Sequence, residues 1–387
     1  MKLDALMAPC RIVNVTVPHP LWEVSPGTEH SMLAILWSDE EVPLGGLVLC
    51  GKEMRDAPER VRRAAGQLVP TRTTVPTSDA SVSVVVCTRN RPTDLARCLD
   101  ALAVSRRSPD ETIVVDNAPS TRAARDVVGG LPGVRYVLAP EPGLSRARNA
   151  GIASSTGELI VFTDDDAIVT PTWLERLVGP FADDGVEAVT GLVLPAELET
   201  TAQVVFERLG GFGRGFHRRD YGYDWYTSHR RHGVPVWTLG AGASMGLRRS
   251  ALARVGGFDE RLGPGAAGVS DDSEIWYRIL ASGGRCVYEP SAVVWHRHRR
   301  EMAELQSQLY AYMRGHVTGL LVQHEVTGDK GNLWRLVVDL PKHYLLQSFL
   351  AAGHPRDPRA RCLPAEITGC IAGVPYYFRT RRRPTRW

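Results

Sequence analysis

Apolar residues between positions 82 and 181 follow two alternating patterns. Residues 82–86 form a continuous β-branched run, which is typical of a strand buried on both faces. Residues 93–104 then place leucines and a cysteine at helical spacing. Further strand-like runs occur at 112–115, 134–138 and 159–162, with helical patterns between them. Strands that alternate with helices predict an α/β fold, with a mostly parallel sheet flanked by helices.

The segments on either side have different patterns. Residues 1–70 contain three short apolar runs and one helical pattern, which predict a small β-rich N-terminal domain. Residues 71–80 are polar and contain proline, as linkers commonly do. Apolar spacing beyond residue 300 is helical, so we expect residues 301–387 to form a helical C-terminal extension. The α/β sheet would then occupy residues 81–300.

Composition places the chain among ordinary globular proteins. It has 387 residues, of which 43% are hydrophobic and 23% are charged, and its formal net charge is +3. This length predicts two domains, or one large domain with extensions. The modest charge gives no reason to expect a nucleic-acid partner.

Cysteine usage and the absence of targeting patterns predict a cytoplasmic protein. The seven cysteines include no Cys-x-x-Cys pair, and their odd number argues against a disulfide framework. The N-terminus has no signal-peptide pattern, and no apolar run reaches the length of about 18 residues that suggests a spanning helix.

The C-terminus leaves two interpretations open. Residues 367–378 are mostly apolar, and basic residues crowd positions 379–383. The apolar part would either pack against the rest of the protein or lie on a membrane surface. The basic run is either a solvated terminus or a peripheral contact with anionic lipid at the inner membrane face.

Three adjacent carboxylates, Asp164, Asp165 and Asp166, come directly after the apolar run 159–162. Such carboxylates repel one another unless a cation or hydrogen-bond donors offset their charge. Polar residues also follow two neighbouring strand-like runs, at 87–91 and 116–117. Ligands of open α/β sheets bind beyond the carboxyl ends of the strands. A site for phosphate and for Mg²⁺ or Mn²⁺ is therefore predicted, with a solvated acidic turn as the alternative.

Six segments, in this order and at this spacing, resemble family 2 glycosyltransferases with the GT-A fold. They are VVVCTRNR at 84–91, IVVDN at 113–117, GLSRARNAG at 143–151, TDDD at 163–166, GGFDE at 256–260 and DDSEIWYR at 271–278. The resemblance covers somewhat more than half of the chain. It implies transfer of a sugar, with inversion, from a nucleotide diphosphate to a hydroxyl acceptor. UDP is the nucleotide we expect, because it is the commonest in the family.

The resemblance also assigns residues to the donor. Asp116 would accept a hydrogen bond from the base, and arginine suits phosphate because its planar fork binds two oxygens. A solvated helix face is the alternative for the arginines of the third segment. The residues expected to bind the donor are Thr88, Arg89, Arg91, Asp116, Arg146, Arg148, Asn149, Asp164 and Asp165.

The cation is expected to be Mn²⁺ or Mg²⁺, bound by Asp164, Asp166 and His296. His298 is the alternative third ligand. We expect the two histidines to point to opposite faces of a strand, so that one ion would bind only one of them. A structural histidine is the alternative for both.

Asp272 corresponds by resemblance to the general base, which takes the proton from the acceptor hydroxyl. It opens a predicted helix that Ser270 could cap. Acidic residues near a helix N-terminus also favour the helix dipole without any catalytic role. Serine at 270 and aspartate at 271 depart modestly from the family pattern, where glycine and glutamate are commoner.

Two segments rich in glycine complete the sequence-based picture. Residues 237–245 would line the sugar and acceptor pocket by resemblance. Residues 210–231 are rich in aromatic and basic side chains, and form either a mobile acceptor loop or an ordinary surface excursion.

Two other functions compete with glycosyl transfer. A sugar-phosphate nucleotidyltransferase would share the sheet and the cation, but the expected glycine-rich loop with a lysine is missing after the first strand. A non-catalytic scaffold that binds nucleotide sugars would not need Asp272.

Overall fold

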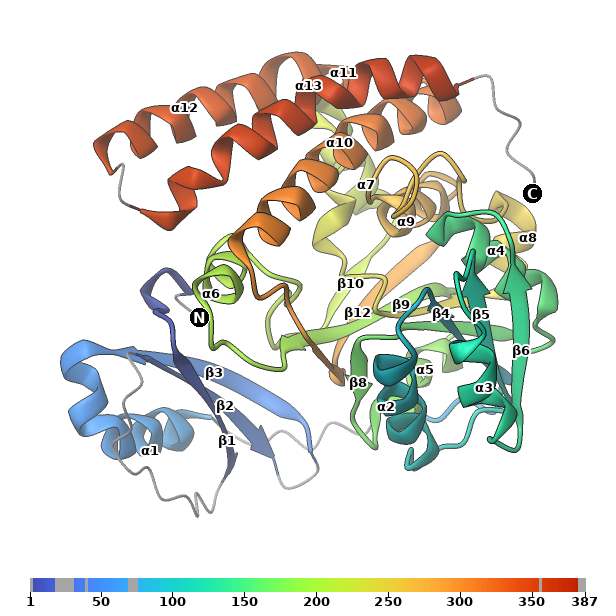
Figure 1. Ribbon diagram of the computed structural model, residues 1–387, viewed down its shortest axis with the longest axis horizontal. Coiled ribbons are helices and arrows are strands. Elements are labelled where there is room, and N and C mark those ends of the chain that lie inside the picture. Colours follow the sequence, from blue (N-terminus) through green and yellow to red (C-terminus); the bar gives the residue numbers. More distant parts are fainter. Residues whose placement is uncertain (1–2, 18–30, 39–40, 69–75, 355–356, 382–387) are drawn as a thin grey trace.

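The computed structural model describes residues 3–17, 31–38, 41–68, 76–354 and 357–381. Its centre is a nine-stranded sheet in the order β10-β12-β9-β11-β7-β4-β5-β6, with β8 paired to β12. Helices cover both faces of this sheet, a small second sheet lies beside it, and the C-terminal helices cross one end (Figure 1). The predicted α/β architecture is confirmed: a large sheet is flanked by helices, with a small N-terminal sheet and a helical C-terminal segment.

The first four strands of the central sheet are parallel. They are β4 (Val82–Thr88), β5 (Glu111–Asn117), β6 (Val134–Ala139) and β7 (Leu159–Asp164). Alternate residues of β4 are buried on opposite faces, which explains its uninterrupted apolar run. Val84 packs on the side of α2, and Val85 packs on the side of α4, where it contacts Gly151.

The remaining strands run in mixed directions. They are β8 (Ala167–Val169), β9 (Val186–Pro195), β10 (Arg219–Tyr221), β11 (Ser244–Arg248) and β12 (Arg285–His296). Strand β11 is antiparallel to both β7 and β9, and β12 is parallel to β9. Two reversals restore the original direction, so β12 ends at the same edge of the sheet as β7. His296 is thereby brought to the edge where the aspartate triplet lies.

Two layers of helices sandwich the sheet. One layer contains α2 (Pro92–Ala103), α3 (Ala123–Gly129) and α5 (Trp173–Val178), and the other contains α4 (Leu144–Ser154), α8 (Arg249–Val255) and α9 (Asp271–Ala281). The helical spacing predicted for residues 93–104 corresponds to α2, whose Leu95, Cys98, Leu99 and Leu102 are all buried.

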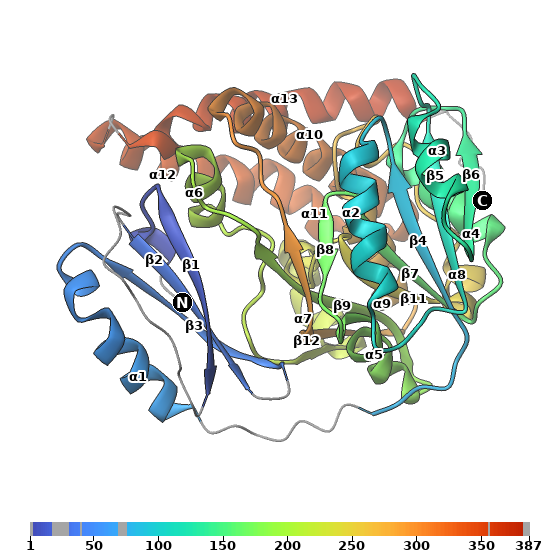
Figure 2. The ribbon, with the colours of Figure 1, turned by 60° about the horizontal axis from the view of Figure 1, so that its bottom comes forward.

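The N-terminal segment forms a three-stranded sheet with one helix. Its elements are β1 (Cys10–Val17), β2 (Ser31–Ser38), β3 (Pro43–Cys50) and α1 (Ala57–Gln67). Figure 2 shows this unit at one side of the central sheet. One face packs under α1, while Leu33 and Ile35 on the other face join the core of the central sheet. Residues 71–75 of the predicted linker lie outside the described residues.

The C-terminal segment is helical, as expected. It contains α10 (Met302–Thr327), α11 (Lys330–Trp334), the π-helical turn η6 (Arg335–Asp339), α12 (Leu340–Gly353) and α13 (Leu363–Thr380). Helix α13 lies along α10. A Cβ at Gly369 would stand 2.4 Å from the Tyr310 carbonyl oxygen, so glycine is needed for this close approach. Part of the predicted basic run, residues 382–383, lies outside the described residues, and no helix in the described segments could span a bilayer.

Candidate active site

A cavity of 1160 Å³ opens where the carboxyl ends of β4, β7 and β12 meet. Thr88, Asp164 and His296 line it from these strands, and the first turn of α9 lines it from across the sheet edge. The wall beyond α9 is built by the C-terminal helices. The cavity therefore lies at the strand edge at which the polar segments predicted a site.

The three aspartates after β7 have different partners. Asp165 is buried and accepts hydrogen bonds from Thr88 Oγ1 at 2.8 Å and from Arg91 Nη1 at 3.1 Å. Asp166 accepts from the same Arg91 nitrogen at 2.8 Å, and Asp164 lies 3.5 Å from Arg148 Nη2. Burial and the neighbouring Asp166 raise the pKa of Asp165 to about 6. Asp165 thus connects the ends of β4 and β7, and the other two carboxylates lie beside His296.

Asp164, Asp166 and His296 form a group that could hold a metal ion. One ligand atom from each lies within 4.8 Å of the others. His296 Nε2 is 3.2 Å from Asp166 Oδ1, and His296 Nδ1 is buried with no hydrogen-bond partner in the described part of the chain. The pKa of Asp166 is held well below its usual value, because His296 and Arg91 outweigh the effect of burial. Two carboxylates and an imidazole fit Mn²⁺ or Mg²⁺.

His298 is engaged elsewhere. Its Nε2 lies 2.7 Å from Glu207 Oε1 on α6 (Thr201–Arg208), and its side chain is buried. The rings of His296 and His298 are 5.5 Å apart, so the prediction that they point to opposite faces was wrong. Residues two positions apart in an extended chain share a face. The hydrogen bond with Glu207, rather than the direction of the side chain, separates His298 from the metal-binding group.

Arg148 connects the aspartate triplet to the acidic pair of α9. Its Nη1 donates to Asp271 Oδ2 at 2.6 Å, and its guanidinium carbon lies 5.3 Å from the centre of the Phe258 ring. A Cβ at Gly242 would stand 2.6 Å from Arg148 Nη2, so glycine makes room for the guanidinium. Burial raises the pKa of Asp271 to about 6, and Arg148 partly offsets this rise.

Asp272 lies in the first turn of α9 and faces the cavity. Its Oδ2 accepts from the Gly242 N–H at 2.9 Å, and its Oδ1 accepts from the Ser273 N–H at 2.6 Å. The predicted cap by Ser270 was wrong, because the Ser270 side chain makes no capping hydrogen bond. Ser270 instead has a left-handed backbone with φ of 74°, a conformation that favours glycine. The two backbone donors hold the Asp272 carboxylate in a fixed orientation.

Two predicted donor-binding side chains are engaged outside the cavity. The Asn149 amide donates to the Phe258 carbonyl at 2.9 Å and accepts from the Phe258 N–H at 2.8 Å. Arg146 pairs with Glu141 and, at 3.3 Å, with Glu260. Neither side chain lines the cavity, whereas Thr88, Arg89, Arg91, Arg148, Asp164 and Asp165 do.

Asp116 is fully buried at the end of β5 and does not line the cavity itself. The Tyr136 hydroxyl donates to Asp116 Oδ2 at 2.9 Å. Asp116 Oδ1 has no hydrogen-bond partner among the residues described. Burial raises the pKa of Asp116, although the Tyr136 hydroxyl opposes the rise.

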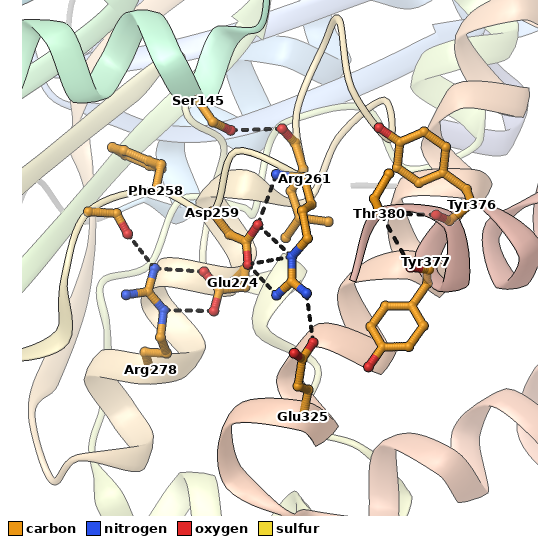
Figure 3. Close-up of polar contacts among 12 residues, drawn as sticks. Ser145, Phe258, Asp259, Arg261, Glu274, Arg278, Glu325, Tyr376, Tyr377 and Thr380 are labelled. Atoms are coloured by element: carbon orange, nitrogen blue, oxygen red, sulfur yellow. Dashed lines mark hydrogen bonds and ion pairs between the residues drawn. The ribbon is translucent and has the colours of Figure 1, made fainter. Parts of the chain in front are cut away.

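Two arginines fix the start of α9, and sequence reasoning had assigned neither a role (Figure 3). Arg278 Nε and Nη2 each lie 2.7 Å from one oxygen of Glu274, and the same guanidinium donates to backbone carbonyls of residues 255–257. Arg261 pairs with Asp259 and, at 2.7 Å, with Glu325 of α10. The segments 256–260 and 271–278 therefore form one buried network that positions the first turn of α9.

The segment 210–231 divides into two parts. Phe212 and Arg214 line the cavity, and the Phe212 ring centre lies 4.9 Å from that of His296. Tyr221 and Tyr226 are buried in the core instead.

The wall formed by the C-terminal helices was not anticipated from the apolar spacing of these helices, because such spacing carries no signal for a ligand. Its lining residues include Tyr312, His316, Arg335, His343 and Arg359.

Comparison with known proteins gives consistent results. Residues 83–256 match the family model described as Glycosyl transferase family 2. A pre-mycofactocin glycosyltransferase of Mycobacterium tuberculosis is 28% identical over 250 residues, which are 64% of this chain and 49% of that protein. The succinoglycan biosynthesis protein ExoM of Rhizobium meliloti is 29% identical over 236 residues, which are 57% of this chain and 68% of that protein. The chain thus spans about half the length of the mycobacterial relative.

A solved structure shares the fold. It is a mannosyltransferase from Pyrobaculum calidifontis in complex with GDP-Man and Mn²⁺. The match has a TM-score of 0.54 and 18% sequence identity, and covers 83% of this chain and 95% of that one.

Proposed function

Because residues 83–256 match the model of glycosyl transferase family 2, we propose that the chain transfers a sugar from a nucleotide-diphosphate donor to a hydroxyl acceptor, with inversion at the anomeric carbon. The observation that carries the proposal is the pairing of two groups in one cavity. Asp164, Asp166 and His296 form a metal-binding group, and Asp272 presents a carboxylate held by two backbone N–H groups. Arg148 and Asp271 connect the two groups.

In this proposal Asp164, Asp166 and His296 hold Mn²⁺ or Mg²⁺, which supplies positive charge against the donor diphosphate when bound. Arg91 fixes Asp166, and Arg89 lines the same cavity, exposed, as a further donor for phosphate oxygens. We expect UDP as the donor nucleotide. Asp116 Oδ1, which has no partner in the described part of the chain, supports this assignment, because a carboxylate oxygen can accept the N–H of a uracil ring.

Asp272 acts as the general base. The acceptor oxygen forms a bond to the anomeric carbon while its proton moves to Asp272 and the bond to the diphosphate breaks. The nucleoside diphosphate then leaves. Attack from the face opposite the leaving group inverts the anomeric carbon without a covalent sugar–enzyme intermediate.

An assay with Mn²⁺ and a panel of nucleotide sugars separates this function from its competitors. Release of nucleoside diphosphate, by transfer or by slow hydrolysis, supports a glycosyltransferase. Release of pyrophosphate from a nucleoside triphosphate and a sugar phosphate would support a nucleotidyltransferase instead. Binding of the donor with no turnover, even with a mixed panel of acceptors, would support a scaffold.

Asp166→Ala should weaken donor binding in the presence of metal. It removes one of three protein ligands, and we expect UDP affinity in Mn²⁺ to fall by at least about tenfold. Calorimetric titration of UDP with and without Mn²⁺ measures this effect. Asp100→Ala, an exposed carboxylate on α2, is the matched control and should bind as the wild type does. An unchanged dependence on Mn²⁺ in Asp166→Ala would remove Asp166 from the site.

A further inference from the structure

Beyond Asp272 the cavity continues to a wall formed by the C-terminal helices, where Arg335 and Arg359 line it together with the carboxylates of Asp339 and Glu366, and Arg214 lines it from the segment 210–231. We propose that this part of the cavity, the basic end, binds an anionic group of the acceptor, a phosphate or a carboxylate. Arg335 would be the central contact, with Arg214 and Arg359 as further donors. The inference rests on the proposed function and adds to it the chemical class of the acceptor.

The basic end is a connected group of side chains. The Arg335 guanidinium carbon lies 4.1 Å from the centre of the Trp237 ring, and Arg335 Nε lies 3.5 Å from His316 Nε2. The Trp237 and His316 rings are 4.9 Å apart, edge to face. Arg214 Nε donates to the Trp237 carbonyl at 3.1 Å. Stacking on Trp237 holds the planar fork of Arg335 in place, which reduces the entropy lost when it binds an anion.

These three half-buried arginines make no ion pair among the described residues, although the charges of Asp339 and Glu366 act on Arg335 and Arg359 from beyond contact distance. In the described segments, no carboxylate oxygen lies within 4.0 Å of a guanidinium nitrogen of Arg214, Arg335 or Arg359. By contrast, the buried arginines at 148, 261 and 278 each have a carboxylate within 2.7 Å. Burial lowers the pKa of Arg214 and of Arg335. A bound anion would offset the cost of burying these charges.

The position of the basic end suits an acceptor rather than the donor. The donor phosphates are accounted for at the metal-binding group. Arg214 lies near enough to Asp272 to experience its charge, and both line the same cavity. An acceptor whose anionic group is bound at Arg335 could therefore extend past Arg214 and present a hydroxyl to Asp272.

Binding of inorganic phosphate tests the inference when UDP and Mn²⁺ already saturate the donor site. We expect Arg335→Gln and Arg359→Gln to weaken phosphate binding, the former by at least about tenfold, because it removes charge-assisted hydrogen bonds. Arg361→Gln is the matched control, since Arg361 is exposed and does not line the cavity. If Arg335→Gln fails to fold without its contact to Trp237, the Arg359 variant decides.

Equal phosphate affinity in the wild type and all three variants would overturn the inference, and so would displacement of phosphate by UDP. Failure of the wild type to bind UDP with Mn²⁺ would instead contradict the proposed function.

A second experiment distinguishes a soluble from a lipid-linked acceptor. Glycerol 3-phosphate and 1-acyl-glycerol 3-phosphate carry the same phosphate group, the first without and the second with a lipid chain. Tighter binding of the first indicates a soluble acceptor, and tighter binding of the second indicates a lipid-linked one.

A different observation supports a second inference, which concerns the outer side of α12. Leu345, Leu346, Phe349 and Leu350 are 72%, 57%, 78% and 50% exposed and occupy one face of the helix. We propose that this apolar face docks on an anionic lipid bilayer. The membrane contact would then lie on α12 itself and not on the basic run at 379–383 alone.

Charge decides between a bilayer and a second copy of this chain. Residues 335–387 contain ten basic and three acidic residues, although the whole chain has a net charge of only +3. A symmetric dimer through α12 would bring two such basic segments together, whereas anionic lipid complements them. An apolar helix face within a segment rich in basic residues is the usual composition of a helix that lies in a membrane interface.

Vesicle flotation tests the second inference. The protein should float with vesicles that contain phosphatidylglycerol, and at least about tenfold less with phosphatidylcholine alone. The double variant Leu345→Ser/Phe349→Ser should lose this binding, while Leu138→Ser, which changes another exposed leucine, on β6, should keep it. Absence of binding to anionic vesicles would overturn the proposal. So would a wild-type dimer that the double variant dissociates, because α12 would then be a protein interface.

Discussion

Asp272→Asn should reduce the rate of sugar transfer by about 10²–10⁴-fold and leave donor binding intact. The amide has nearly the same shape as the carboxylate, but it cannot accept the proton of the acceptor hydroxyl. The carboxylate is held by the Gly242 and Ser273 N–H groups, and Arg148 pairs with Asp271 rather than with Asp272. The substitution therefore changes the proton acceptor without removing the counter-charge of Arg148.

Two measurements separate loss of the base from general damage. Titration of UDP in Mn²⁺ should give the wild-type affinity, while release of nucleoside diphosphate in the presence of acceptor is slowed. Asp224→Asn, an exposed aspartate on α7 (Tyr223–His229), is the control and should be unchanged in both. Loss of UDP binding in Asp272→Asn would mean that Asp272 supports the donor site, and its assignment as base would fail.

The strand ends were predictable because buried parallel strands have a strong local signature. An uninterrupted β-branched run followed by polar residues places those residues at the carboxyl edge of a sheet, wherever the strand lies in it. Asp164 and Thr88 are found there, as expected. The position of β12 could not be predicted in this way, because it depends on the antiparallel β11 that separates β7 from β9. His296 was proposed from resemblance rather than from the topology.

Helix geometry explains why, of the two arginines in segment 143–151, only one lines the cavity. Successive residues of an α-helix are turned by about 100°, so Arg146 and Arg148 point in directions about 160° apart. Arg148 faces the cavity and Arg146 faces Glu141 and Glu260. The register of a helix with no strong apolar face cannot be read from its sequence, and α4 has buried and exposed residues that do not separate by polarity.

The basic end could not be predicted for a related reason. Trp237, His316 and Arg335 come from three different segments, of which the first lies far from the other two in the sequence, and each has an ordinary local pattern. Their contact depends on how α10 and η6 pack against residues 233–242, and apolar periodicity does not specify such packing. Long-range polar contacts of this kind are visible only in the folded structure.

Arg278→Met should lower the free energy of unfolding by about 3–5 kcal/mol. Glu274 is completely buried, and Arg278 binds both of its oxygens, so the variant leaves a carboxylate without its counter-charge. Urea unfolding measures the loss. Arg254→Met breaks an exposed ion pair with Glu187 and should cost less than about 1 kcal/mol. Equal losses in the two variants would show that burial of the Glu274 pair contributes nothing beyond an exposed ion pair.

The pH dependence of Arg278→Met gives an independent check on the same cause. Burial already raises the pKa of Glu274, while Arg278 opposes the rise, so removal of the arginine raises this pKa further. A group whose pKa is higher in the folded state than in the unfolded state binds more protons when folded, and stability then falls as pH rises. The variant should therefore lose more stability relative to the wild type at pH 8 than at pH 5.

Replacing both partners, as Glu274→Leu/Arg278→Met, should recover part of the lost stability and remove the difference between pH 8 and pH 5, because no unpaired charge remains buried. If the double variant is stable but transfers sugar slowly, the Arg278 pair matters chiefly because it positions the first turn of α9 and hence Asp272.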